Sequence, residues 1–314
     1  MPHPRLLAFA QLLRLPNVFT AFADIALAST VAATILPSTS TAFWVAAGLI
    51  ALASGCLYLA GMVWNDVFDR AEDAATRPNR PLPSGRIRVR TAIALGVLLF
   101  LLGLTFAALA GLPTIGKASD WNHEPLVYAV GITIAVLIYD GGLKRTPIGP
   151  VGMGSCRFLN VLFGLSIIPD DTFDPGLRIH LAGVIGVYIV GVTWFARTEE
   201  GQSNRRQLIA AASVIALALV LALILKAQLQ IPIESGTVLF PYLLVLFAFF
   251  VGRPVARAIA YCGPRDVQTA VKRCVLGLVG LDAVLATGFA GWPGLLIVLL
   301  LPPALVIGKW VYST

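Results

Sequence analysis

Three aspartates and an asparagine are gathered in residues 65–73 of a chain with few acidic residues, 16 Asp and Glu among 314. Asp66, Asp69 and Asp73 are spaced by three and four residues, which predicts that their carboxylates share one face of a helix. Carboxylates this close repel one another and need a cation among them. Mg²⁺ suits such hard oxygen ligands, because it binds through one or two carboxylates and completes its shell with water and substrate phosphates. Asn65 stands directly before the first aspartate.

Arginines follow this acidic cluster directly. Their guanidinium groups are suited to phosphate oxygens, which they bind in a bidentate manner. An acidic metal face followed by an arginine-rich loop, at the end of an apolar span, predicts a diphosphate site at a membrane surface. The alternative, for the arginines alone, is a charged loop that only sets the orientation of the neighbouring membrane helices. The arginines are Arg77, Arg80, Arg86, Arg88 and Arg90.

The elements that must position these groups are membrane-spanning helices. Apolar residues make up 58% of the chain, charged residues make up 12%, and the mean hydropathy is +0.84, unlike a soluble domain. Ten apolar windows long enough to span a bilayer predict one all-α, polytopic membrane domain over residues 1–314. Its first helix is expected to be retained rather than cleaved as a signal peptide. The windows fall at 17–36, 42–64, 90–111, 125–140, 149–168, 178–196, 207–226, 237–252, 267–289 and 293–311.

The basic residues predict how the helices are oriented. If successive loops alternate sides and the N-terminus lies inside, 19 of the 23 Lys and Arg residues fall on the inner side. This bias predicts that the aspartate cluster faces the cytoplasm. The net charge of +7 does not predict a nucleic-acid partner, because the basic residues lie in short loops between apolar spans.

The pattern N-D-x-x-D-x-x-x-D followed by R-P-x-R-P-x-x-S-G, over residues 65–85, resembles the first aspartate-rich motif of the UbiA family of intramembrane prenyltransferases. The resemblance is strong from Arg14 to about Gly164 and weaker beyond. It implies a UbiA-like bundle of nine helices around a central cavity, and with ten windows we expect nine to ten helices. It also implies Mg²⁺ bound by Asp66, Asp69 and Asp73.

Two further spans carry polar groups that the family places near the diphosphate. The fourth span ends in Tyr139, followed by Lys144 and Arg145, which by default set topology but resemble a basic family element that contacts the diphosphate. In the fifth span, Arg157 and Asn160 are three residues apart and share a face. A charge inside a span usually faces a polar cavity, although Arg157 could instead serve helix packing. Asn160 matches a family asparagine near the diphosphate.

The chain departs from the family in the loop after the sixth span. Family members commonly carry a second D-x-x-x-D motif there for a second magnesium, whereas this chain offers Glu199 and Glu200. Adjacent residues lie about 100° apart on a helix, so both face one metal only if the chain turns locally. We expect one of these glutamates to be a metal ligand. Asp24 and Asp282 also lie inside spans, where each either neutralises a basic partner or lines the cavity.

The resemblance implies a Mg²⁺-dependent transfer of a prenyl group from a prenyl diphosphate to a lipophilic, aromatic acceptor within the membrane. In this hypothesis Lys144, Arg145 and Arg77 neutralise the leaving diphosphate, Asn65 lies nearby, and Tyr139 offers an aromatic face to the carbocation. The altered second motif motivates an alternative, a protein that binds or moves an isoprenoid or another lipid without catalysis. A CDP-alcohol phosphotransferase is disfavoured, because its D-G-x-x-A-R pattern is missing.

Overall fold

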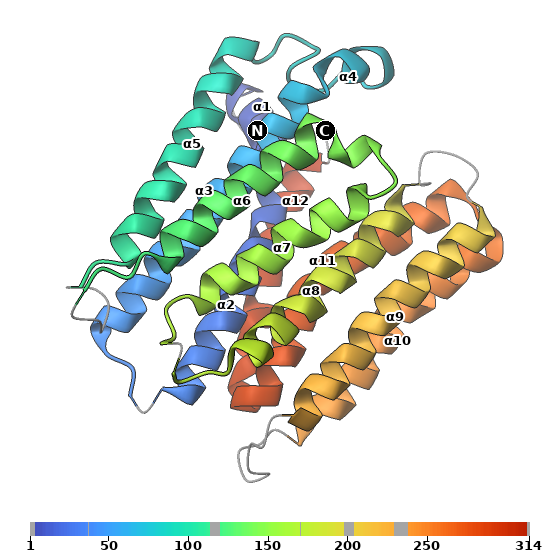
Figure 1. Ribbon diagram of the computed structural model, residues 1–314. Helices are drawn as coiled ribbons and strands as arrows, with labels where there is room; N and C mark the ends of the chain where they lie inside the picture. The colour runs from blue at the N-terminus through green and yellow to red at the C-terminus, as the bar shows by residue number, and fades with distance from the viewer. Residues whose placement is uncertain are drawn as a thin grey trace.

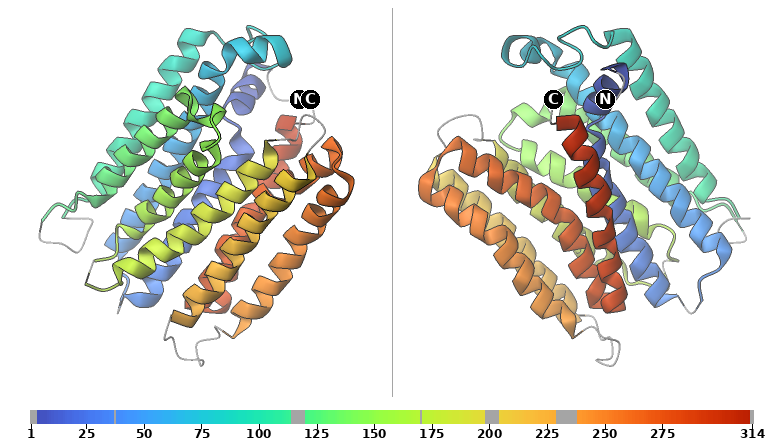
Figure 2. Two further views of the ribbon diagram at one scale, coloured as in Figure 1. Left: turned by 45° about the vertical axis from the view of Figure 1, so that its right-hand side comes forward. Right: turned by 180° about the vertical axis from the view of Figure 1, so that it is seen from behind.

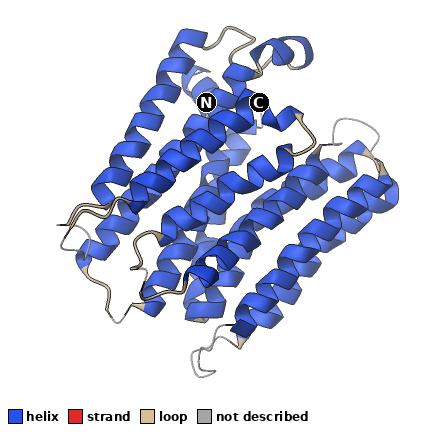
Figure 3. Ribbon diagram, viewed as in Figure 1, coloured by secondary structure: helices blue, strands red, loops and turns tan. Residues whose placement is uncertain are grey.

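The protein is a helical bundle in a computed structural model, which describes residues 4–36, 38–113, 120–169, 171–197, 204–228 and 238–312 (Figure 1). Within these ranges every regular element is a helix, as Figure 3 shows by colour. Nine helices in the described ranges are long and apolar enough to cross a membrane. The predicted all-α, polytopic fold class is therefore confirmed.

Most of the long helices are followed by a partner that returns through the bundle. The first half consists of α1 (Pro4–Leu12), η1 (Leu15–Asn17), α2 (Val18–Ile35), α3 (Thr41–Phe68), α4 (Arg70–Thr76), α5 (Val89–Ala110), α6 (Glu124–Gly141) and η2 (Leu143–Arg145). The second half consists of α7 (Gly149–Leu165), α8 (Pro175–Ala196), α9 (Arg205–Gln228), α10 (Leu239–Tyr261), α11 (Pro264–Ala290), η4 (Trp292–Leu300) and α12 (Leu301–Tyr312).

Each of the ten predicted windows coincides with helix. Nine of them are the candidate spans of the described residues, and the tenth is α7, which has 17 residues. Helix α7 packs against α6, α8 and α2, so this short helix is surrounded by longer ones. The last window combines the 3₁₀ segment η4 with α12.

The outer helices expose apolar side chains, as helices in contact with lipid do. On α10, for example, Leu246 and Phe249 are among the most exposed large apolar residues of the chain. Helix α11 is the reverse case, because most of its spanning window is buried between α2, α8, α10 and η4. The core of the bundle thus forms around α11 and its neighbours.

A close approach between α2 and α7 sets the depth at which their polar side chains meet. A Cβ atom at Gly164 would lie 2.5 Å from the Cβ atom of Ala28, a distance at which one helix would have to shift. Glycine therefore lets α7 lie directly against α2, and Asn160, one turn earlier, faces the same helix.

One end of the bundle collects the motif-bearing connections. The α3–α4–α5, α6–α7 and α10–α11 connections, the last turn of α8 and the first turn of α9 all lie at the end where both chain termini are found (Figure 2). We call this the α4 end, because α4 lies across it (Figure 1).

Candidate functional site

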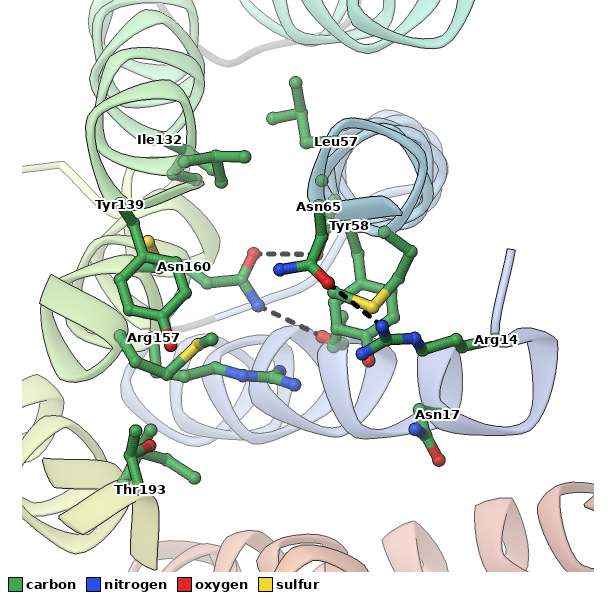
Figure 4. A pocket seen from close by; sticks show the side chains of 18 of the residues that line it. Arg14, Asn17, Leu57, Tyr58, Asn65, Ile132, Tyr139, Arg157, Asn160 and Thr193 are labelled. Carbon is green, nitrogen blue, oxygen red and sulfur yellow. Dashed lines mark hydrogen bonds between the residues drawn. The ribbon is translucent and has the colours of Figure 1, made fainter. Parts of the chain in front are cut away.

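A cavity of about 290 Å³ enters the bundle between α2, α3, α6, α7, α8 and α11. Its polar lining at the α4 end includes Arg14, Asn65 and Asp140. Figure 4 shows Arg14 and Asn65 joined by a hydrogen bond, with Leu57 and Ile132 on another wall. The apolar lining comprises Leu57, Ile132, Val136, Met153, Ile189, Val192, Val275 and Leu278, among others. A cavity with a charged mouth and an apolar interior suits a ligand with a charged head and a hydrocarbon tail.

The aspartate stretch does not form the single helix face that its spacing predicts. Helix α3 ends at Phe68 and α4 begins at Arg70, so Asp69 lies at the break, with φ −87° and ψ 2°. Helical hydrogen bonds continue across it, from Asp69 N to Asn65 O (3.0 Å) and from Asp73 N to Asp69 O (2.8 Å). The bend at Asp69 nevertheless separates the carboxylates into two sets, which corrects the expectation of three stacked side chains.

The first set joins Asp66 and Asp73 through a shared arginine. Arg80 Nη1 lies 2.7 Å from Asp73 Oδ2 and 3.6 Å from Asp66 Oδ1. Arg14 Nη2 donates to Asp66 Oδ1 at 3.0 Å and to Asn65 Oδ1 at 2.9 Å. Both aspartates are buried. Each arginine thus compensates a carboxylate that would otherwise be costly to bury.

The second set joins Asp69 to the basic residues that follow α6. Lys144 Nζ donates to Asp69 Oδ2 at 2.7 Å, and Arg145 Nη2 donates to Asp69 Oδ1 at 3.2 Å. Lys144 also lies 3.4 Å from Asp140 Oδ1, which accepts from Asn65 Nδ2 at 2.7 Å. Asn65 donates to one set and accepts from the other, so it links the two.

The segment that carries Lys144 and Arg145 is fixed by the end of α8. The Arg197 guanidinium donates to the Lys144 carbonyl at 3.0 Å, to the Pro147 carbonyl at 3.3 Å and to the Thr146 carbonyl. Lys144 belongs to the 3₁₀ segment η2, and Thr146 and Pro147 lie between η2 and α7. Arg197 therefore determines where the two basic side chains stand.

A second polar network lies deeper, between α2, α3 and α7. Arg157 donates to Asp24 Oδ2 at 3.0 Å and to Thr20 Oγ1 at 2.6 Å. Asn160 Nδ2 donates to the same Asp24 oxygen at 2.8 Å, and Ser54 Oγ donates to Asn160 Oδ1 at 2.7 Å. Arg157, Asn160 and Ser54 line the cavity, whereas Asp24 is fully buried behind them. We call Asp24, Arg157, Asn160, Ser54 and Thr20 the deep network.

The remaining sequence-predicted residues fall in different places. Tyr139 lines the cavity near its mouth. Arg77 is exposed just after α4. Glu199 and Glu200 lie outside the described residues. Asp282 is fully buried on α11, where its carboxyl group interacts with Asp24 and Arg157.

Two residues at the mouth were not predicted as site residues, namely Arg14 and Asp140. Each had a signal in the sequence. Arg14 is an isolated charge directly before the first apolar span, and Asp140 ends the fourth span four residues before Lys144, a spacing that favours an ion pair on a helix. Neither signal identifies Asn65 and Asp66 as the groups they meet.

The carboxylates at the mouth fit a magnesium ion that is bound together with a diphosphate. Among the described residues no three His, Cys, Asp or Glu side chains come together as a complete metal site. Asp66, Asp73 and Asp140 each use one carboxylate oxygen in the contacts above, which leaves the second oxygen to a ligand. Magnesium needs only one or two carboxylates when water and phosphate oxygens complete its octahedron.

Comparisons with known proteins agree with this geometry. Residues 25–269 match the profile of the UbiA prenyltransferase family. The chain is 29% identical over 238 residues to digeranylgeranylglyceryl phosphate synthase of Methanopyrus kandleri, which covers 72% of this chain and 82% of that protein. It is 32% identical over 125 residues to the synthase of the same name from Saccharolobus solfataricus, 39% of this chain and 40% of that protein. That shorter match thus spans about two fifths of the relative's length.

Solved structures show the same fold at lower identity. A structure described as digeranylgeranylglyceryl phosphate synthase in membranes superposes with a TM-score of 0.65 at 18% identity, over 92% of this chain and 99% of that one. A UbiA homolog from Archaeoglobus fulgidus, bound to GPP and Mg²⁺, superposes with a TM-score of 0.59 at 16% identity, over 85% of this chain and 99% of that one.

Proposed function

The chain belongs to the UbiA prenyltransferase family, and we propose that it transfers a prenyl group from a prenyl diphosphate to a lipophilic acceptor inside the membrane, with Mg²⁺. The observation that carries this proposal is the charged end of the cavity. Arg14, Asn65 and Asp140 line it there, and they contact Asp66 and Lys144, which lie next to the lining. A prenyl diphosphate has the same division into a charged head and an apolar tail. The Archaeoglobus homolog that is bound to GPP and Mg²⁺ supports it.

The basic residues at the mouth act on the leaving group. Lys144 and Arg145 are held against Asp69 at 2.7 and 3.2 Å, and Arg14 against Asp66 at 3.0 Å. When a diphosphate enters, these cations exchange a carboxylate for phosphate oxygens. They then stabilise the charge that grows on the diphosphate as the allylic C–O bond breaks. Because their positions are set beforehand, little reorganisation is needed at that moment.

The carboxylates beside these cations would hold the magnesium ion. Asp66, Asp69 and Asp73 are the proposed ligands, with Asn65 and Asp140 beside them. When bound, Mg²⁺ supplies a Lewis acid that polarises the phosphate oxygens. We also propose that one of two glutamates, Glu199 or Glu200, is a ligand of a second metal ion. Both lie outside the described residues.

The cavity wall provides for the rest of the substrate. The prenyl tail lies along apolar residues such as Leu57, Ile132 and Val136. The Tyr139 ring, at the mouth, offers its face to positive charge at C1. Arg157 and Asn160 present polar groups where an acceptor must approach. The family resemblance favours an aromatic acceptor, whereas the relatives above are named for a glyceryl phosphate lipid, so both acceptor classes enter the test.

We also propose that the α4 end faces the cytoplasm. The charge bias of 19 in 23 basic residues supports this orientation. The diphosphate would then enter from the side on which soluble metabolism makes it, while the tail and the acceptor enter laterally from the bilayer. Reporter fusions at the two chain termini, both at the α4 end, would test it.

The decisive experiment follows diphosphate release by the purified full-length protein. The reaction contains geranylgeranyl diphosphate, Mg²⁺ and either geranylgeranylglyceryl phosphate or a hydroxylated aromatic acid, and mass spectrometry identifies the product. We expect release with one acceptor, and a loss of at least about 100-fold in Asp66→Ala, because the mutation removes a metal ligand and the partner of Arg14. The matched control is Asp120→Ala, an exposed carboxylate at the opposite end.

Two results would contradict the proposal. Equal activity of Asp66→Ala and the wild type would remove the aspartate stretch from the reaction. Tight, Mg²⁺-dependent binding of geranylgeranyl diphosphate without release, for every acceptor, would instead identify a carrier of isoprenoids.

A further inference from the structure

A second charged cavity lies apart from the site described above. It is a groove of about 580 Å³ between α10 and α11, lined by Arg253, Pro254, Arg257, Tyr261, Thr269 and Arg273. We call it the basic groove. It lies towards the α4 end, because α10 ends and α11 begins there (Figure 2). None of its lining residues lines the central cavity.

The basic groove carries more positive than negative charge. Arg257 Nε is paired with Asp266 Oδ1 at 2.9 Å. Within the described part of the chain, Asp266 is the one carboxylate that forms a salt bridge with any of the three arginines. Arg253 and Arg257 are four residues apart on α10, a spacing at which like charges destabilise a helix. The groove thus has the charge to hold an anion.

The arginines stand next to an apolar surface. Arg273 of α11 lies over the ring of Phe250 on α10, 5.3 Å from its centroid. One turn further along α10, Leu246 and Phe249 are 65% and 73% exposed. The ring of Tyr261 packs under Arg257 at 5.7 Å and lies at the end of the helix. Such a change from charged to apolar side chains is typical of the boundary between lipid headgroups and acyl chains.

The length of α10 places the arginines at this boundary. Residues 239–252 rise about 21 Å at 1.5 Å per residue, less than the roughly 30 Å thickness of a bilayer core. The apolar part of α10 is therefore too short to span the hydrocarbon core. The charge of Arg253 falls within that core unless a lipid headgroup moves inward to contact it. Orientation by positive charge explains why arginines occur at this end, but not why two helices direct them into one groove.

We propose that the basic groove binds the phosphate of an anionic membrane phospholipid, with its acyl chains along Leu246 and Phe249. Basic pockets between membrane helices bind such headgroups elsewhere. The phosphate ester would lie between Arg253 and Arg273, which have no acidic partner in the described part of the chain, and Thr269 offers a hydroxyl beside them. This proposal does not depend on the prenyl-transfer chemistry.

The test measures the lipid that remains bound to the full-length protein. Protein in mild detergent is titrated with phosphatidylglycerol or phosphatidylcholine, and native mass spectrometry gives the apparent Kd for each. We expect tighter binding of phosphatidylglycerol. Since each arginine near an anionic lipid contributes about fivefold, Arg253→Gln/Arg273→Gln should bind it about 30-fold more weakly.

The matched control removes two exposed arginines from the same end of a neighbouring helix. Arg205→Gln/Arg206→Gln on α9 should bind phosphatidylglycerol as the wild type does. The single variant Arg253→Gln, expected to weaken binding about fivefold, serves if the double variant does not fold. Equal affinity for the two lipids, or equal losses in both double variants, would overturn the proposal. So would inorganic phosphate that competes as strongly as the lipid, since the site would then accept free phosphate.

Discussion

The mouth of the cavity and the deep network use the same residue types in opposite ways. At the mouth, cations and carboxylates share partners, and the exposure of the basic side chains ranges from 13% at Lys144 to 55% at Arg145. In the deep network, Asp24 is fully buried and the Arg157 side chain is 12% exposed. Ion pairs at the mouth can exchange a carboxylate for a phosphate at low cost. Those of the deep network cannot part without leaving a charge stranded among apolar helices.

This difference assigns distinct tasks to the two regions. Shared, exchangeable pairing at the mouth suits binding and release of a diphosphate and a metal ion. Fixed pairing in the deep network holds α2 against α7 and presents Asn160 and Ser54 to the cavity in one orientation. We therefore expect mutations at the mouth to change activity, and mutation of Asp24, which does not line the cavity, to change stability.

The largest expected effect on stability comes from Asp24→Ala. It removes the salt-bridge partner of Arg157 and one of the two acceptors of Asn160 Nδ2, and loss of one partner of a buried ion pair costs about 3–5 kcal/mol. We expect a corresponding fall in the free energy of unfolding, measured by SDS titration in mixed micelles. The double variant Asp24→Leu/Arg157→Leu should recover part of it, because it removes the stranded guanidinium but leaves the buried Asp282, which interacts with both groups.

The contrast between the regions would fail if Asp24→Ala left stability unchanged. It would also fail if the fraction that remains folded bound prenyl diphosphate much more weakly than the wild type does. In that case the deep network would act on the diphosphate directly.

The largest expected effect on activity, apart from Asp66→Ala, comes from Lys144→Ala. The substitution removes a cation that faces the leaving group, and loss of one such donor costs about 100-fold in rate. Stability should fall less than in Asp24→Ala, because Arg145 Nη2 still donates to Asp69 at 3.2 Å and Asn65 Nδ2 still donates to Asp140 at 2.7 Å. Single-turnover rates with geranylgeranyl diphosphate, beside thermal unfolding, measure both quantities. A large fall in stability with an unchanged rate would reverse the assignment.

Much of the fold, but less of the pairing, can be predicted from the sequence. All ten apolar windows are helices, because spanning a bilayer demands long apolar runs that hydropathy detects directly. The spacing of Asp66, Asp69 and Asp73 indicates a shared helix face, yet α3 ends at Phe68, since nothing in the spacing reports the bend.

Sequence patterns do not identify which residues far apart in the chain become partners. A charge inside a span must have a partner, so Asp24 and Arg157 each signal a polar contact. They are 133 residues apart, and only the approach of α2 and α7 identifies them as a pair. Arg14 and Asp66, 52 residues apart, are a second example.

A smaller effect is expected from Arg197→Ala. Arg197 contacts no proposed substrate group and acts through the turn that carries Lys144, whose carbonyl it binds at 3.0 Å. Removing hydrogen bonds of this kind costs about 1 kcal/mol, equivalent to about a fivefold loss in rate. Arg197→Lys should restore part of it, because an ammonium group still donates to the carbonyls. A loss as large as that of Lys144→Ala would mean that Arg197 itself contacts the diphosphate.

The smallest expected effect is the difference in how the ion pairs of the two regions respond to salt concentration. Raising the ionic strength from 0.1 to 1 M shortens the Debye length from about 10 to about 3 Å, which screens exposed charges far more than buried ones. A double-mutant cycle for Asp69 and Arg145 should give a coupling of about 0.5 kcal/mol at low salt and almost none at high salt. The cycle for Asp24 and Arg157 should give the same coupling at both. If both couplings fell together, the deep network would be open to ions, and its fixed pairing could not be what keeps α2 against α7.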